Sequence, residues 1–351
     1  MISNSTPVKI LSVATAVPEH NILQSEIKSF ATSLFGNSFQ DIDRLLPIFE
    51  NTKIKTRNLG KPLSWFAEDH DFASSNSAYC EVAVKLAEEA SRKAISLSNT
   101  RKEDIEILLF VSSTGISTPS LDSMLIQNLG LSNSTSRIPI WGLGCAGGVS
   151  GLSTAAKLKR SVQKRVLLVC VELCSLTFIK DDLSKSNLVA TSLFGDGAAA
   201  VILGSEGDGP EILDSHSTLF DNSADVMGWD VIPAGLKVRF SRDVPSIIRN
   251  SMPLVIESAC QKWTIDRNEL EQFVFHPGGA KVLQAYEDSL GLDRNQLNHA
   301  YDVLAENGNL SSTSVLFVLE RHLKMEIPKN KYGLMAALGP GFSAELALFK
   351  W

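Results

Sequence analysis

The chain has 351 residues, of which 44% are hydrophobic and 21% charged, and its formal net charge is −6. This composition is typical of a soluble globular protein that is long enough for two domains or one large duplicated domain. The negative charge disfavours nucleic acid and anionic membranes as general partners.

Cysteine usage and the N-terminus indicate the compartment. Neither a disulfide framework nor a zinc site is expected, because the number of cysteines is odd and none forms a CxxC pair. Residues Met1–Ser5 show no basic segment followed by an apolar stretch, so no signal peptide is predicted. No apolar run is long enough to span a bilayer, so stable membrane insertion is not expected. A reducing cytoplasm is the predicted location. The five cysteines are Cys80, Cys145, Cys170, Cys174 and Cys260.

Short apolar runs alternate with helical patterns along the chain. Continuous apolar runs suit strands of a sheet that is covered on both faces, so the fold class is α/β. In chain order we expect a helix in Glu81–Ser96, a strand in Ile105–Val111, a helix in Val149–Leu158, strands in Val166–Val171 and Ala198–Leu203, a helix in Pro253–Trp263, a strand in Phe273–Phe275 and a helix in Ser314–Leu323.

One local pattern occurs twice. Arg101–Glu106 follows a predicted helix and leads into a strand, and Asp266–Glu271 does the same in the second half. Chance produces such helix–turn–strand units, but gene duplication also explains the pair and is the interpretation we favour. The predicted halves are residues 1–204 and 205–351.

Cys145 lies in the glycine-rich stretch Trp141–Gly148, directly before the helix predicted from Val149. A cysteine at a strand-to-helix junction meets free backbone N–H groups and the positive end of the helix dipole, which favour a thiolate. The same N–H groups would be able to hold the oxyanion of an attacked thioester. The alternative is a small buried cysteine in a tight turn.

A histidine and an asparagine follow in the second half. His276 comes directly after the strand Phe273–Phe275, and residues just past strand ends line the functional crevice of α/β folds. A structural or exposed histidine is the alternative. Asn309 precedes the helix predicted from Ser314, where its amide would be able to donate to a substrate oxygen. The alternative for this segment is helix capping, with Ser311 or Ser312 as the cap.

Together these stretches resemble the type III polyketide synthases, the chalcone-synthase-like branch of the thiolase superfamily. The resemblance rests on motifs in the family's order: GCAGG around Cys145, LFGDGAA at Leu193–Ala199, Arg242–Pro245, FHPGG around His276, GNLSS around Asn309, and Gly339-Pro340-Gly341. It implies a five-layered αβαβα fold, a homodimer, and a buried site that acyl-CoA and malonyl-CoA reach through a tunnel. It also implies that Cys145 is the nucleophile, His276 the base, Asn309 its partner in an oxyanion pocket, and Phe194 an aromatic gatekeeper.

Under this resemblance the enzyme is an acyltransferase that condenses malonyl-CoA units, with loss of CO2, onto an acyl-CoA starter held on Cys145. No metal or organic cofactor is required by that chemistry. Further residues are assigned to substrate binding: Ser311, Gly339, Pro340 and Gly341 near the site, and Arg44 as the basic residue for CoA.

The chain departs from the plant pattern at the cavity. Val238 replaces a second gatekeeper phenylalanine, with Phe240 two residues on, Cys174 replaces a threonine, and Thr118 replaces a methionine on the loop that reaches across the dimer. These changes favour a medium- or long-chain fatty acyl starter, as in bacterial family members, and an alkylpyrone or alkylresorcinol-type product. The alternatives are a malonyl-primed or aromatic-starter type III enzyme and a single-condensation β-ketoacyl-carrier-protein synthase. Less favoured are a hydroxymethylglutaryl-CoA synthase with Glu81 as acid/base, a papain-like hydrolase and a non-enzymatic binding protein.

Overall fold

The computed structural model describes residues 6–36 and 42–351. The segment Met1–Ser5, for which no signal peptide is predicted, lies outside these residues. Within them, the main sheet is weakly connected at one point. Strands β1 (Lys9–Ala16) and β8 (Glu211–Leu219) join there through the single pair Lys9 and Glu211. The sheet therefore divides into two half-sheets at that junction.

The two half-sheets have matching strand orders. The first runs β5-β4-β6-β7-β1, and the second runs β11-β12-β13-β8. The strands are β1 (Lys9–Ala16), β4 (Ile105–Val111), β5 (Ser136–Ile140), β6 (Arg165–Leu173), β7 (Asp196–Gly204), β8 (Glu211–Leu219), β11 (Leu270–Phe275), β12 (Tyr332–Gly339) and β13 (Ser343–Lys350).

The pairing directions repeat as well. β4 and β6 are parallel, and so are β11 and β12, while the next two strands of each half-sheet pair antiparallel. Helix α5 (Phe72–Leu97) and a 3₁₀ turn precede β4, and helix α9 (Val244–Trp263) and a 3₁₀ turn precede β11. The repeated pattern in the sequence thus marks equivalent positions of two similar halves. The division after residue 204 stays a prediction, although it falls at the end of β7.

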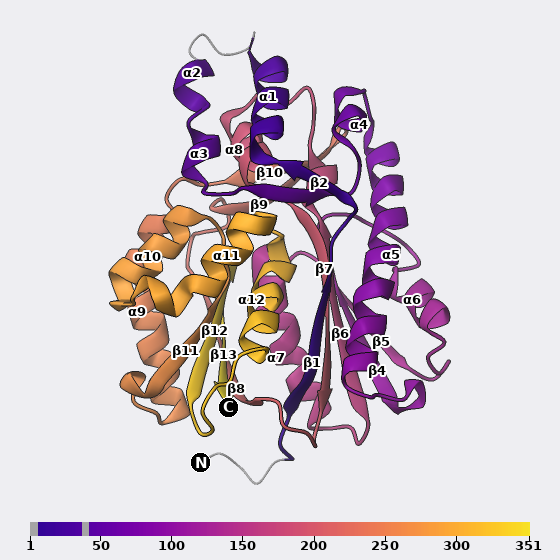
Figure 1. Cartoon of the computed structure of the whole chain (residues 1–351), viewed down its shortest axis with the longest axis vertical. Coiled ribbons are helices and arrows are strands. Elements are labelled where there is room, and N and C mark those ends of the chain that lie inside the picture. Colours follow the sequence, from indigo (N-terminus) through magenta and orange to yellow (C-terminus); the bar gives the residue numbers. More distant parts are fainter. Residues whose placement is uncertain (1–5, 37–41) are drawn as a thin grey trace.

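Helices form three layers around the half-sheets (Figure 1). Helices α7 (Gly147–Lys159) and α12 (Ser314–Leu323) lie in the middle, α5 and α6 (Asp122–Leu129) cover one outer side, and α9 and α10 (Ala280–Leu290) cover the other. Apolar side chains on both faces of each half-sheet are buried against these helices, which explains the continuous apolar runs. The predicted five-layered αβαβα fold is confirmed.

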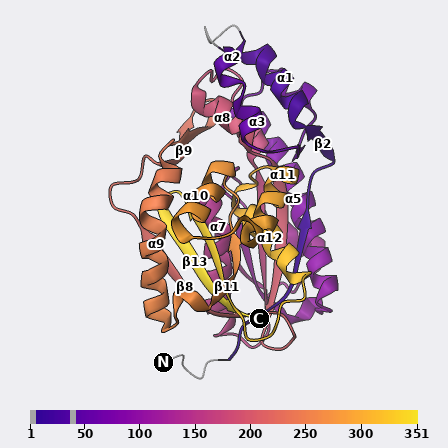
Figure 2. The same ribbon diagram turned by 60° about the vertical axis from the view of Figure 1, so that its left-hand side comes forward.

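Shorter elements gather at one end of the molecule, opposite the chain termini (Figure 2). Their own small core includes Ile27, Phe35, Phe49 and Leu188. They lie beyond the carboxyl ends of β4, β6 and β11 and close the space there. These elements are β2 (His20–Leu23), α1 (Gln24–Phe35), α2 (Ile42–Leu45), α3 (Ile48–Asn51), β3 (Thr56–Leu59), α4 (Leu63–Ala67), α8 (Lys185–Leu193), β9 (Met227–Ile232) and β10 (Gly235–Phe240). Helix α11 (Asn298–Asn307) instead lies beside α10 and α12 (Figure 1).

The predicted elements all exist, but several are longer than their patterns. Helix α5 begins nine residues before Glu81, because the side chain of Asp71 accepts a hydrogen bond from the N–H of Ser74 and caps it. Helix α9 starts at Val244 and runs through Pro253. None of the described helices combines the length and apolarity needed to cross a membrane.

Candidate active site

Three segments from both halves meet at one small cavity. Cys145 lies in the 3₁₀ turn Gly144–Ala146 at the start of α7, His276 follows β11, and Asn309 connects α11 to α12. All three side chains line the cavity and are buried, with exposed fractions of 5%, 4% and 1%. The structure thus brings together the three residues to which the resemblance assigns the chemistry.

Asn309 is held in a defined orientation. Its Oδ1 accepts a hydrogen bond of 2.8 Å from the N–H of Ser311. Its Nδ2 therefore faces the cavity, where it lies 3.9 Å from Sγ of Cys145 and 3.3 Å from the carbonyl oxygen of Gly278. An amide with its oxygen already bound is a donor to whatever oxygen occupies the cavity.

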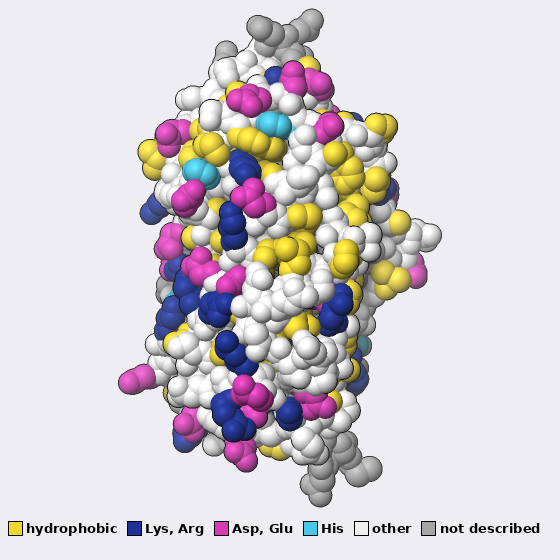
Figure 3. All heavy atoms as spheres, turned by 90° about the vertical axis from the view of Figure 1, so that its right-hand side faces the viewer, with side chains coloured by type: hydrophobic (Ala, Val, Ile, Leu, Met, Phe, Trp, Pro, Cys, Tyr) yellow, Lys and Arg dark blue, Asp and Glu magenta, His cyan; other side chains and the backbone are white. Residues whose placement is uncertain are grey.

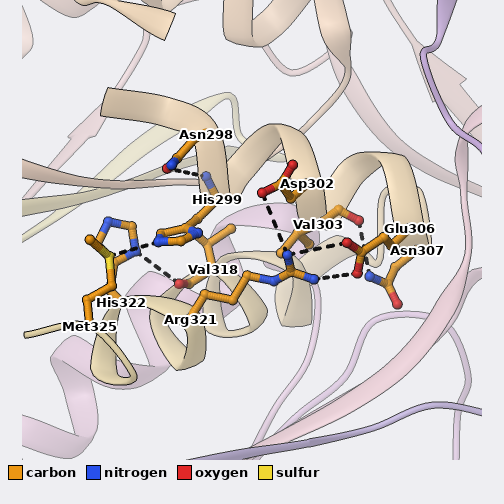
Figure 4. Close-up of polar contacts among 10 residues, drawn as sticks. All are labelled: Asn298, His299, Asp302, Val303, Glu306, Asn307, Val318, Arg321, His322 and Met325. Atoms are coloured by element: carbon orange, nitrogen blue, oxygen red, sulfur yellow. Dashed lines mark hydrogen bonds and ion pairs between the residues drawn. The ribbon is translucent and has the colours of Figure 1, made fainter. Parts of the chain in front are cut away.

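The two helices that flank Asn309 are tied together (Figure 4). Arg321 on α12 pairs with Glu306 and, at 3.9 Å, with Asp302, both on α11. Farther along, Nε2 of His299 lies 2.8 Å from the sulfur of Met325. These contacts fix the α11–α12 connection and with it the position of Asn309.

The serines near Asn309 do not cap α12. The first residue before α12 is Thr313, which makes no side-chain cap, so the capping alternative for Ser311 and Ser312 is wrong. Ser311 instead adopts a left-handed backbone with φ of 52° and bonds Asn309, whereas Ser312 donates to Glu172. The segment serves the site rather than the helix end.

The Gly339–Gly341 loop supports the Cys145 turn from behind. A Cβ at Gly339 would lie 2.5 Å from the carbonyl oxygen of Leu143 and 2.7 Å from the nitrogen of Ala146, and Pro340 packs on Gly144. None of the three loop residues lines the cavity that holds Cys145, His276 and Asn309. Their predicted role in substrate binding stays a prediction.

Burial dominates the charge states of the two titrating groups. It raises the pKa of the Cys145 thiol to about 12 and lowers the pKa of His276 to about 3. Burial thus opposes the thiolate that the helix N-terminus favours. Moving the thiol proton to His276 creates two opposite charges at once, and their attraction offsets part of that penalty.

Several backbone N–H groups of the turn are already used within the protein, whereas a side chain of the cavity is not. The N–H groups of Gly142 and Gly144 donate to Oγ of Ser113, and that of Ala146 donates to Leu143. By contrast, neither ring nitrogen of His276 has a hydrogen-bond partner among the described residues. His276 and Asn309 both present side-chain nitrogens to the cavity, as expected of donors to a substrate oxyanion.

The sequence interpretation missed a buried acid, Glu172, at the end of β6. Its carboxylate accepts from the N–H of Ser113, from Oγ1 of Thr114 and from Oγ of Ser312. Burial raises its pKa to about 7, and its charge acts on Cys145. The signal was an acid inside the apolar run Val166–Leu173, where an unpaired charge is not tolerated.

A second, mainly apolar cavity lies beside the catalytic one, since its wall residue Phe194 pairs with Asn309. Phe194, Cys174 and Val238 line it, as does a buried arginine that the sequence interpretation did not single out, Arg57. Phe240 lines the catalytic cavity instead.

Two predicted positions lie elsewhere. Thr118 is exposed and precedes a cis peptide bond to Pro119, and Arg44 is exposed on α2. Neither lines either of the two cavities. No cluster of three or more His, Cys, Asp or Glu side chains suited to a metal ion is found in the part of the chain that the structure describes.

The class of protein follows from this fold and from comparison with known families. The N-terminal domain of the chalcone and stilbene synthases matches residues 2–207, and their C-terminal domain matches residues 211–350. The chain belongs to this family, and it is a type III polyketide synthase, an acyltransferase.

Individual relatives agree. A putative chalcone synthase of Bacillus subtilis is 43% identical, covering 97% of this chain and 98% of the relative. An alpha-pyrone synthesis polyketide synthase-like protein of Mycobacterium tuberculosis is 29% identical over 98% of this chain and 91% of its own. The crystal structure of 1,3,6,8-tetrahydroxynaphthalene synthase from Streptomyces coelicolor superposes with a TM-score of 0.93 at 28% identity, covering 98% of this chain and 99% of that one.

Proposed function

We propose that this enzyme extends a medium- or long-chain fatty acyl starter, held on Cys145, with malonyl-CoA units and releases an alkylpyrone or alkylresorcinol-type product. The observation that carries the proposal is the apolar cavity beside the catalytic one. Its walls are mainly hydrocarbon, as expected of a site that takes a fatty acyl tail. An acyl tail buried there gains the hydrophobic free energy of leaving water.

The first step loads the starter. Sγ of Cys145 attacks the carbonyl carbon of the acyl-CoA thioester while His276 takes the thiol proton. The C–S bond to CoA then breaks, and the CoA thiolate leaves with that proton. The small side chains of Cys174 and Val238 line the cavity that would take the tail beyond Phe194.

The second step extends the chain. Malonyl-CoA loses CO2, and the electron pair left behind is an enolate whose oxygen accepts hydrogen bonds from His276 and Asn309. Its carbon attacks the Cys145 thioester, a C–C bond forms, and the cysteine sulfur leaves. The lengthened chain is then carried by CoA and is able to return to Cys145 for another round.

We also propose a homodimer in which the Thr118 loop reaches the partner's cavity. Supporting it, Ile116, Met124 and Trp141 are exposed near this loop. Figure 3 shows hydrophobic side chains gathered over the face that carries α5 and α6. A Met124→Glu variant should lower the dimer fraction in sedimentation experiments.

The free state of the five cysteines suits the cytoplasm that we propose as the compartment.

A second candidate is a malonyl-primed synthase, favoured by the similarity to tetrahydroxynaphthalene synthase. The two candidates differ in what fills the apolar cavity. A malonyl-primed chain is rich in oxygen from the start, whereas a fatty acyl starter places hydrocarbon there.

The test is a panel of acyl-CoA starters, from acetyl through aromatic to long-chain, incubated with malonyl-CoA and read by mass spectrometry. We expect products that contain a fatty acyl group and several malonyl-derived units. A Cys145→Ala variant should form none, and a Cys80→Ala variant serves as the matched control. Products from malonyl-CoA alone would favour the second candidate, and products only from aromatic starters would overturn the fatty acyl assignment.

A further inference from the structure

Arg57 is a buried cation on the wall of the apolar cavity. It lies on β3 with an exposed fraction of only 2%. Its Nη1 donates a hydrogen bond of 2.6 Å to the carbonyl oxygen of Phe194. Its Nε and Nη2 are also buried but have no hydrogen-bond partner among the described residues. Buried donors are normally paired, so these two nitrogens indicate a missing acceptor.

The nearby acid does not provide that acceptor. Asp196 interacts with Arg57 through its charge, but its oxygens accept from the N–H of Gly60, the N–H of Ser175 and Oγ of Ser175. Burial lowers the pKa of Arg57 to about 9, so the guanidinium stays charged at neutral pH. The protein thus balances the charge of Arg57 while leaving its donors unsatisfied.

The remaining walls of the cavity define which ligand fits. Around Arg57 they are largely apolar, with Ile27, Phe30, Leu63 and Phe178 among them. A plain hydrocarbon tail would satisfy these walls but would leave the guanidinium unpaired. A hydrocarbon chain that carries oxygen at one place satisfies both, because the planar fork of arginine donates two hydrogen bonds side by side.

We propose that Arg57 binds a ketone or enolate oxygen of the extended poly-β-keto chain once that chain has passed Phe194. This inference rests on the proposed function, since the chain is its intermediate. The starter tail enters the cavity without oxygen. Each extension then lengthens the chain by two carbons, so that ketones come to lie on alternate carbons. Arg57, tethered to the backbone of Phe194, is then a positioning residue that favours the chain length at which a ketone first reaches it.

Binding is tested without turnover in a Cys145→Ala protein. The hydrophobic dye N-phenyl-1-naphthylamine, which carries no oxygen, reports whether the cavity is intact, and decane-2,4-dione is the competing ligand. We expect the diketone to displace the dye, and Arg57→Met to weaken diketone binding by about 10- to 100-fold with dye affinity changed less than twofold. Equal diketone affinity with and without Arg57 would overturn the proposal.

A conservative variant covers the case in which Arg57→Met does not fold. Arg57→Lys keeps the charge but loses the fork, so diketone affinity should fall at least fivefold while dye binding persists. In the active enzyme the same Arg57→Lys change should shift products toward fewer malonyl-derived units. An unaltered product distribution together with unaltered diketone affinity would contradict the proposal.

The two proposals fail in different ways. If the wild-type enzyme extends no fatty acyl-CoA but the Cys145→Ala protein binds the diketone through Arg57, the starter assignment is wrong and the binding site stands. If fatty acyl-CoA is extended but the Arg57 variants bind diketone and make products like the wild type, the starter assignment stands and the role of Arg57 is refuted.

Discussion

Sγ of Cys145 and the side-chain amide of Asn309 lie 3.9 Å apart although 164 residues separate them in the sequence. Cys145 precedes α7 and Asn309 precedes α12, and these helices occupy equivalent places in the two halves. Cys145 and Asn309 therefore face each other because each precedes the central helix of its own half.

An Asn309→Asp substitution should lower kcat by about 100- to 1,000-fold, because a carboxylate repels the enolate that the amide stabilises. Condensation is measured as release of CO2 from malonyl-CoA. Asn298→Asp at the start of α11 is the matched control, since its oxygen would still accept from the N–H of His299. Wild-type kcat in the Asn309 variant would remove Asn309 from the chemistry.

A Val238→Phe substitution should narrow the apolar cavity and shift starter preference from long to short acyl-CoA. The expected measure is a fall of at least tenfold in kcat/KM for a long-chain starter, with little change for a short one. Val231→Phe in the neighbouring strand β9 is the control, because Val231 is 66% exposed and lies outside the cavity. Parallel losses for all starters would indicate damage to the fold instead.

Glu172 should make the protein less stable as the pH rises. Its folded pKa is about 7 and its ordinary value is 4.5, so the folded state holds the proton more tightly than the unfolded state. This contribution is present below about pH 4.5 and is lost as the pH rises through about 7, with a size on the order of 3 kcal/mol. Thermal melts of Glu172→Gln should show a smaller loss over this range than the wild type, and identical pH profiles would refute the assignment.

A Gly339→Ala substitution should reduce both stability and activity, because the new methyl group meets the backbone of Leu143 and Ala146 at less than 3 Å. Overpacking of this kind costs about 1–3 kcal/mol. Calorimetry and kcat report the two effects. Gly60→Ala is the control, since its Cβ would meet its nearest neighbour at 3.4 Å. A Gly339 variant with wild-type melting temperature and rate would show that the loop yields easily.

Much of the fold could be predicted because the signals are local. The apolar run Ile105–Val111 coincides with β4, and the helical pattern Ser314–Leu323 coincides with α12. The start of α5 at Phe72 was missed because the residues before Glu81 are mostly small and polar, and their helical state depends on the Asp71 cap and on packing. The repeated helix–turn–strand pattern was informative because each copy has to form the same local structure.

That Cys145, His276 and Asn309 meet at one cavity was predictable, because residue type and motif coincide at these positions. Glu172 and Arg57 were missed because their roles depend on partners far away in the chain. Glu172 accepts from residues 59 and 140 positions away, and Arg57 donates to a carbonyl 137 positions away. The burial of the Cys145 sulfur, which opposes its ionisation, was also not predictable, because it depends on how the whole fold packs around the turn.

The meeting of α7 and α12 at the centre has a mechanical consequence. Since each half contributes one side of the gap between Cys145 and Asn309, any sliding of one half against the other changes that gap before it changes anything inside either half. The rate of condensation should then depend strongly on the relative position of the two halves. Pressure or mild denaturant should slow catalysis before either half begins to melt.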